Sequence, residues 1–394
     1  MMNYNKITNI ISEAIKKVSS NKNQPYFPLH EPEINKDDIK LVENCLKSGW
    51  VSTQGNFINR FEHSLKKMTG ANHILLLNSG TSALHLCLKS LDVKDNDEVL
   101  VPALTFIATV NAIKYCNATP HFVDSDYTTL GVDSKKLLIY LKKKTKKTRN
   151  GLKNIKTGNF IKALIVTHVY GHPAELDTLK KIADKFGIYL IEDAAEALGS
   201  YYKRKHVGNF GIISAISFNG NKIITTGAGG AILTNNSILF KKVKHLSSVA
   251  KVEKRIDFYH DKVGYNYKMP NINAALGLGQ IKKISNFLKK KRRLANKYKF
   301  FFDNIEEIEF FKEPKYTKSN FWLNIIFLKT NSIKIRNRIL SKLEKKKIYC
   351  RPIWFPINKL PMYKKCPSMN LNNLEKINKN LICLPSSPIL IGKN

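Results

Sequence analysis

The sequence is short of long apolar runs, paired cysteines and acidic residues, and each shortage excludes a class of protein. No apolar run approaches the ~20 residues that a membrane-spanning helix needs. Residues 1–20 are polar and mildly amphipathic, and they lack the apolar core of a signal peptide. We therefore expect a cytoplasmic protein without a membrane partner.

Only six cysteines occur in the 394 residues, and none stands in a C-x-x-C pair. Reduced thiols are therefore expected rather than disulfides or a redox motif. His168 and His172 are four residues apart, but they lie where a strand runs into a Gly/Pro loop, not on a helix face. The sequence thus predicts no metal site.

Acidic residues are scarce: 30 Asp and Glu stand against 66 Lys and Arg, for a formal net charge of +36. Such a charge would suit nucleic-acid binding. Only 9 of the basic residues are arginine, however, and arginine supplies the planar fork that reads bases and phosphates. We expect no nucleic-acid partner, and the runs 142–147 and 289–293 are expected to be solvated. A non-catalytic basic binding or regulatory protein stays an alternative.

Short apolar segments alternate with helical stretches from Ile74 to Leu233, the pattern of a mostly parallel sheet covered by helices. The predicted class is α/β, with a large domain and a small C-terminal α+β domain. Asn271–Phe300 is predicted to be one long helix between them. The small domain should have strands at Asn320–Leu328 and Lys347–Arg351. Seven strands are expected in the large domain, near 74, 99, 121–123, 163–166, 189–191, 212–218 and 231–233.

Lys222 follows the apolar run Ile212–Phe218, where a strand gives way to a loop. Burial near apolar neighbours disfavours a charged amine. An uncharged lysine in a cleft can form a Schiff base with a carbonyl compound or with pyridoxal phosphate (PLP). Taken alone, a solvated surface lysine is the commoner outcome, so other segments must decide.

A PLP site also needs a carboxylate for the pyridine nitrogen. Asp193 stands at the end of the apolar run Tyr189–Ile191, where open α/β sheets place ligand groups. An aspartate there could equally cap the N-terminus of a helix.

The phosphate and the ring of PLP need partners too. Ile74–Leu77 runs into Gly80, Thr81 and Ser82, a turn that opens a helix whose N–H groups and dipole attract anions. An ordinary capped helix is an equal alternative. Phe106 follows the strand near Val99 and could stack on a ring, although core packing is the commoner fate of phenylalanine.

Along the chain the motifs come in the order phosphate turn, aromatic residue, carboxylate and Ser-x-x-x-x-Lys. In that order they resemble the DegT/DnrJ/StrS sugar aminotransferases, a family of fold-type-I PLP enzymes. The resemblance runs from about Pro28 to about Leu390. It closely matches the branch that aminates UDP-linked 4-keto-6-deoxy-N-acetylhexosamines on routes to bacillosamine and legionaminic acid. The segments that match the family are 79–84, 102–106, 192–196, 217–222, 264–269 and 351–354, and those that match the branch are 27–32, 50–55, 217–226 and the polar turn 157–159.

The resemblance implies the cofactor PLP and a role for each matching residue. Lys222 would be the Schiff-base lysine and proton shuttle, Asp193 would pair with the pyridine nitrogen, and Phe106 would stack on the ring. Asn266 would reach the phosphate of a neighbouring subunit, which implies a homodimer with shared sites. The phosphate of the same subunit would be held by Gly80, Thr81 and Ser217.

Two positions depart from the family pattern. Glu196 stands where the family often has glutamine, beside the phenolic oxygen of PLP, and a carboxylate there would repel that oxygen unless protonated. Lys268 stands where arginine is usual and lacks its bidentate fork. The resemblance further implies that the substrate contacts Thr53, His168, Lys268, Arg351 and Trp354.

The sequence therefore predicts an aminotransferase that takes an amino group from an amino acid, glutamate by resemblance, to a nucleotide-linked keto-sugar. A sugar dehydratase of the same family is an alternative, but those enzymes have histidine at the position of Lys222. The expected organisation is an N-terminal helical arm (1–27), a large PLP-binding domain (28–265) and a small domain (266–394).

Overall fold

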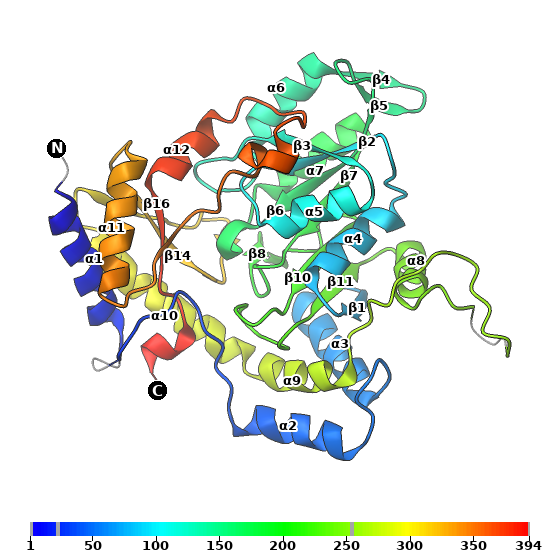
Figure 1. Cartoon of the computed structure of the whole chain (residues 1–394), viewed down its shortest axis with the longest axis horizontal. Helices are drawn as coiled ribbons and strands as arrows, with labels where there is room; N and C mark the ends of the chain where they lie inside the picture. Colours follow the sequence, from blue (N-terminus) through cyan, green and yellow to red (C-terminus); the bar gives the residue numbers. More distant parts are fainter. Residues whose placement is uncertain (1–2, 21–23, 253–255, 393–394) are drawn as a thin grey trace.

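A seven-stranded sheet forms the centre of the computed structural model, which describes residues 3–20, 24–252 and 256–392 (Figure 1). The strand order is β1-β11-β10-β7-β6-β2-β3, and only β11 runs antiparallel to its neighbours. All seven predicted strands are present, so the mostly parallel α/β sheet is confirmed. Their bounds are β1 (His73–Leu77), β2 (Asp97–Pro102), β3 (Thr119–Val123), β6 (Phe160–Thr167), β7 (Tyr189–Asp193), β10 (Ile213–Ser217) and β11 (Gly230–Thr234).

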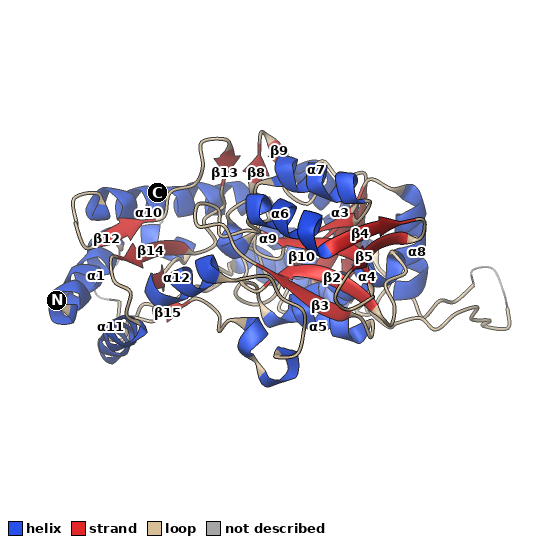
Figure 2. Cartoon of the chain, turned by 90° about the horizontal axis from the view of Figure 1, so that it is seen from above, coloured by secondary structure: helices blue, strands red, loops and turns tan. Residues whose placement is uncertain are grey.

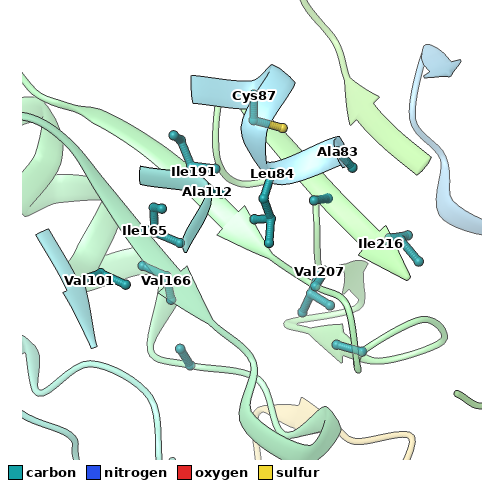
Figure 3. Close-up of a cluster of buried hydrophobic side chains, with 14 of the residues drawn as sticks. Ala83, Leu84, Cys87, Val101, Ala112, Ile165, Val166, Ile191, Val207 and Ile216 are labelled. Atoms are coloured by element: carbon teal, nitrogen blue, oxygen red, sulfur yellow. The ribbon is translucent and has the colours of Figure 1, made fainter. Parts of the chain in front are cut away.

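Helices cover both faces of this sheet, because its strands are apolar on both sides. Figure 2 shows α5 on one face and α6 and α7 on the other. Figure 3 shows Ala83, Leu84 and Cys87 of α4 beside Ile191 and Ile216 of the sheet. The helices of this part are α2 (Lys36–Lys47), α3 (Asn56–Thr69), α4 (Gly80–Ser90), α5 (Ile107–Tyr115), α6 (Ser134–Lys144), α7 (Leu176–Phe186) and α8 (Ser237–Ser247).

Two small additions flank the central sheet. A hairpin of β4 (Thr145–Thr148) and β5 (Gly151–Asn154) pairs with the start of β6, and it carries part of the lysine run 142–147, which is exposed as expected. The expectation is wrong for the run 289–293, because Lys290 and Lys291 are buried. A three-stranded sheet comprises β8 (Tyr201–Tyr202), β9 (Lys205–His206) and β13 (Thr317–Lys318).

The C-terminal part is built on a four-stranded antiparallel sheet in the order β12-β14-β16-β15. The predicted strand at 320–328 begins later, at Asn324, and the one at 347–351 is wrong, because only Arg351 and Pro352 pair in the sheet. The elements are β12 (Ile308–Phe310), β14 (Asn324–Leu328), β15 (Arg351–Pro352), β16 (Leu381–Leu384), α10 (Ile284–Phe302), α11 (Ile333–Lys345) and α12 (Asn372–Asn380). Short 3₁₀ turns lie at Val169–Gly171, Ile357–Lys359, Pro361–Tyr363 and Pro388–Ile391.

The predicted long helix 271–300 is two helices, α9 (Asn271–Lys282) and α10, with a break at Lys283. The cause is a change of packing partner. α9 packs on α2 and α3, where Gly277 lies so close to Phe61 that a Cβ would meet its ring at 2.4 Å. α10 instead packs on the C-terminal sheet and on α1 (Tyr4–Val18).

The N-terminal helix α1 belongs to the core of the C-terminal part. Ile7, Ile11 and Ile15 are fully buried against α10 and α11. The domain limits 28–265 and 266–394 stay a prediction, and α9 lies beyond residue 265 while packing on α2 and α3. Within the ranges that the structure describes, no helix combines the length and apolarity needed to cross a membrane.

Candidate active site

One cavity of about 320 Å³ collects most of the predicted cofactor residues. It lies at the carboxyl ends of β7 and β10 and at the N-terminus of α4, so it brings together segments that are far apart in the sequence. Predicted residues that line it are Gly80, Thr81, Phe106, Asp193, Glu196, Ser217, Lys222 and Trp354. Thr109, Asn219, Asn221 and Trp322 also line it and were not predicted.

The Lys222 side chain reaches into this cavity from the loop after β10 and is only 11% exposed. Its Nζ donates a hydrogen bond to Glu196 Oε1 at 3.1 Å and lies 4.2 Å from the centre of the Trp322 ring. The amine is therefore buried, as the sequence predicted, and it contacts both a carboxylate and an aromatic ring.

Glu196 is buried, and both of its carboxylate oxygens have partners. Oε2 accepts a hydrogen bond from the backbone N–H of Tyr170 at 2.9 Å, while Oε1 faces Lys222. Burial raises the pKa of the Glu196 carboxyl, and the nearby Lys222 opposes that shift. Tyr170 has a φ of 56°, a conformation rare outside glycine, so Glu196 stabilises an unusual backbone.

Asp193 ends β7 with its carboxylate fixed on both oxygens. Thr109 donates a hydroxyl hydrogen bond to Oδ2 at 2.5 Å, and Ala195 donates its backbone N–H to Oδ1 at 3.1 Å. The alternative of a helix cap is wrong, because in the described chain Asp193 is followed by turns up to β8 rather than by a helix. An aspartate oriented this way presents a fixed negative charge to a ligand.

The N-terminus of α4 lines one end of the cavity. Ser79 caps the helix by accepting the N–H of Ser82 at 3.0 Å, as the sequence predicted for a capped helix. The N–H groups of Gly80 and Thr81 have no preceding turn to bond and stay available to a ligand. A Cβ on Gly80 would lie 2.9 Å from the Cβ of Ser217, so the missing side chain lets the two segments approach.

Phe106 is 50% exposed, although it stands in an otherwise buried segment. Its ring lies edge-on to Trp354, with the centroids 6.2 Å apart. Core packing, the alternative for this residue, is therefore wrong. An exposed ring beside the cavity can cover a flat ligand.

The predicted substrate residues do not all meet at this cavity. Thr53 and Lys268 line a second cavity of about 350 Å³, and Asn266 is exposed outside both. Arg351 is exposed beside Glu344, with 3.6 Å between Nη1 and Oε1. Trp354 alone among the predicted substrate residues lines the cavity that holds Lys222.

The structure does not bring His168 to the cavity, which corrects the expectation of a substrate contact. Its ring is fully buried, with Nε2 3.0 Å from Glu192 Oε2, and Nδ1 accepts the N–H of Ala174 at 3.2 Å. Burial opposes the charge of Glu192, but hydrogen bonds from His168 and the N–H groups of Gly208 and Gly211 lower its pKa overall. His168 thus stabilises a buried carboxylate.

His172 points elsewhere and packs against Phe311, with ring centroids 4.6 Å apart. No grouping of three or more His, Cys, Asp and Glu side chains in the described ranges could hold a metal ion. All six cysteines are free, and five of them are buried.

The donor set fits PLP. A buried amine, a fixed carboxylate, an exposed ring and a helix N-terminus stand around one cavity, which matches the aldehyde, the pyridine nitrogen, the ring and the phosphate. Thr109 and Trp322 add to this set. Thr109 lies in the first turn of α5, three residues after Phe106, so its place near the cavity could have been inferred from the sequence. Trp322 comes from the C-terminal part of the chain, and no local sequence pattern marks it as a site residue.

Comparisons with known proteins agree with this assignment. The GDP-perosamine synthase of Escherichia coli O157:H7 is 37% identical over 338 residues, 86% of this chain and 87% of that protein. The UDP-4-amino-4,6-dideoxy-N-acetyl-beta-L-altrosamine transaminase of Campylobacter jejuni is 32% identical over 354 residues, 89% of this chain and 90% of that protein.

Among solved structures, Helicobacter pylori PseC, an aminotransferase involved in the biosynthesis of pseudoaminic acid, superposes with a TM-score of 0.82. It is 28% identical, and the match covers 91% of this chain and 93% of that one. The fold is that of fold-type-I PLP aminotransferases, as predicted. The model of the DegT/DnrJ/EryC1/StrS aminotransferase family matches residues 32–394. The chain therefore belongs to the DegT/DnrJ/EryC1/StrS aminotransferase family, and it is a PLP-dependent enzyme.

Proposed function

We propose that this PLP-dependent nucleotide-sugar aminotransferase moves an amino group from an amino acid, expected to be glutamate, to the ketone of a nucleotide-linked keto-deoxy-sugar. The acceptor proposed first is a UDP-4-keto-6-deoxy-N-acetylhexosamine, used in the synthesis of a surface glycan. The observation that carries the proposal is the meeting of Lys222 and Asp193 in one cavity beside the exposed Phe106 ring.

When bound, PLP supplies an aldehyde and a ring that withdraws electrons from the reacting carbon. Lys222 Nζ would bond to that aldehyde and, once released, carry the proton between the cofactor carbon and the substrate carbon. Asp193, fixed by Thr109 and Ala195, would hold the proton of the ring nitrogen. Phe106 would cover the ring and limit its contact with water.

Glu196 gains a role from its contact with Lys222. The amine must lose its charge before it can act as a nucleophile or a base. A carboxyl with a raised pKa, 3.1 Å from that amine, is placed to hold the proton in the meantime. A protonated Glu196 would also not repel the phenolic oxygen of PLP. Glutamate at this position, where the family often has glutamine, is then compatible with the cofactor.

We infer that the enzyme works as a homodimer with shared active sites. Asn266 is exposed and lies outside the cavity of its own subunit. Thr53 and Lys268 line a separate cavity together with Glu62 and Lys244. A second copy that brings this surface to the Lys222 cavity would place a cation and an amide near the phosphates of the cofactor or the substrate.

A GDP-linked keto-sugar is the second candidate acceptor. The similarity to a GDP-perosamine synthase, at 37% identity, exceeds the 32% identity to the transaminase that is named for a UDP-sugar. The routes to bacillosamine and legionaminic acid remain proposals. Lysine at position 222 argues against a dehydratase, which would carry histidine there.

Turnover assays with UDP-, GDP- and dTDP-linked 4-keto-6-deoxy-sugars, with glutamate as donor, test the proposal. We expect one nucleotide class to be aminated with a kcat/KM at least ~10-fold above the others. Lys222→Ala is the control and should aminate none. A protein that neither binds PLP nor aminates any member of the panel would favour the basic binding protein instead.

A further inference from the structure

Trp322 lies against the reacting amine, although it comes from the C-terminal part of the chain. Its ring centre is 4.2 Å from Lys222 Nζ, which also donates a hydrogen bond to the Glu196 carboxylate at 3.1 Å. The face of an indole ring carries partial negative charge and attracts an ammonium group. The free amine of Lys222 therefore has two attractive neighbours.

Three hydrogen bonds fix the Trp322 ring and backbone. The indole Nε1–H donates to the carbonyl of Asn221 at 2.8 Å, one residue before Lys222. The backbone N–H of Trp322 donates to Asn320 Oδ1 at 2.8 Å, and its carbonyl accepts from Lys291 Nζ at 3.1 Å. The bond to Asn221 ties the ring to the backbone next to the lysine.

Asn320 connects both neighbours of the amine. Its Nδ2 donates to the carbonyls of Glu196, at 2.8 Å, and Leu198, at 3.0 Å, while its Oδ1 holds the N–H of Trp322. Gly171 makes room for this side chain, since a Cβ there would lie within 2.9 Å of the Asn320 amide carbon. One amide thus ties together the backbones of the two residues whose side chains contact Lys222 Nζ.

We propose that Trp322 is a positioning residue of the reaction: its indole face holds Lys222 Nζ in place whenever that amine is not bonded to the cofactor. In each half-reaction the lysine leaves the cofactor, carries a proton and returns. A ring that attracts the ammonium keeps the free amine beside the reacting carbon. The inference rests on the proposed function of Lys222 as the cofactor lysine.

The test compares Trp322→Leu, which removes the aromatic face, with Trp322→Phe, which keeps a face but loses the bond to Asn221. The steady-state kcat of Trp322→Leu should fall about 10- to 100-fold, with the KM for glutamate changed less than about threefold. Trp322→Phe should recover most of kcat. Equal loss in both variants would show that the hydrogen bond matters and not the face, and would overturn the proposal.

A second readout uses cofactor-free protein and does not depend on turnover. Without the ring, the ammonium form loses an attractive partner, so Trp322→Leu should capture added PLP about two- to fivefold faster at neutral pH. Structural damage would slow capture instead, and slower or unchanged capture in this variant would contradict the proposal.

The matched control is Phe302→Leu, another buried aromatic-to-leucine change, remote from the cavity at the end of α10. It should lower thermal stability yet leave capture and kcat at the wild-type level below the unfolding temperature. Borohydride reduction and peptide mapping of each protein separate the two hypotheses. If PLP is trapped on a lysine other than Lys222 in the wild type, the role of Lys222 in the proposed function is refuted. If PLP is trapped on Lys222, the capture rates and kcat values test the role of Trp322 alone.

Discussion

Gly230 and Ser79 approach so closely that a Cβ on the glycine would lie 2.5 Å from the backbone carbonyl of the serine. Gly230 begins β11, and Ser79 caps α4 at the end of the cavity that Gly80 and Thr81 line. The sheet and the turn before α4 therefore meet backbone to backbone at this point. Any side chain at position 230 must displace the helix N-terminus.

Gly230→Ala should therefore weaken PLP binding and destabilise the fold by about 1–3 kcal/mol, because backbone atoms cannot move aside cheaply. PLP titration and urea unfolding measure the two effects. Gly220→Ala serves as control, since the nearest atom to its Cβ would be 3.9 Å away. Wild-type PLP affinity in Gly230→Ala would show that the turn tolerates displacement.

Lys222→Ala should abolish the covalent attachment of PLP and transamination. The amine that bonds the aldehyde and moves the proton is then absent. Borohydride trapping with peptide mapping checks this in the wild type and the variant. A trapped adduct on another lysine would overturn the assignment.

Asp193→Asn should lower turnover by about 10²-fold or more, since the fixed charge that keeps the pyridine nitrogen protonated is lost. PLP should still bind through its phosphate, because the helix N-terminus is unchanged. Single-turnover kinetics and PLP titration measure the two quantities. Near-normal turnover would reduce Asp193 to a structural role.

Asn266→Ala should weaken PLP retention without unfolding the subunit, because the side chain is exposed in its own chain. Mixing this variant with Lys222→Ala should restore activity. Each heterodimer would have one site with both residues intact. Mixed dimers that form and stay as inactive as their parents would refute shared sites.

His172→Phe should make the protein more resistant to acid. Burial lowers the pKa of His172 to about 3, below the value near 6.5 of an unfolded chain. Between these values the unfolded state binds more protons, so stability falls as pH drops from 6.5 towards 3. At pH 5 the buried, uncharged His172 lowers the free energy of unfolding by about 2 kcal/mol.

Urea unfolding at pH 7 and pH 5 measures the difference, with the same change at the exposed His63 as control. We expect the free energy of unfolding to fall less from pH 7 to pH 5 in His172→Phe than in the wild type. An identical loss in both would mean that His172 does not contribute to acid sensitivity.

The central fold followed from the sequence because each strand is a short apolar run between turn residues, from Ile74 to Leu233. The break at Lys283 did not, since the apolar stripe continues across it and only the packing partner changes. The bounds of the C-terminal strands were also poorly predicted, because apolar residues just before β14 have other roles: Phe321 packs in the C-terminal core, and Trp322 lines the cavity.

For the site, residues at strand ends could be predicted and those brought from elsewhere could not. Asp193, Ser217 and Phe106 each stand just where an apolar run ends. Trp322 reaches Lys222 across 100 residues of sequence, and no local pattern marks it. The burial of His168 against Glu192 was missed for the same reason, because a buried pairing between neighbouring strands leaves no signature in either one.

The packing of α1 on α10 and α11 has a consequence for synthesis on the ribosome. About 265 residues separate Val18 from Ile284. At roughly 5–20 residues per second, the apolar face of α1 waits about 15 to 50 s for its partner. We expect nascent chains that end before α10 to expose Ile7, Ile11 and Ile15 to chaperones and proteases, and limited proteolysis of stalled chains of increasing length would find α1 protected only after α10 emerges.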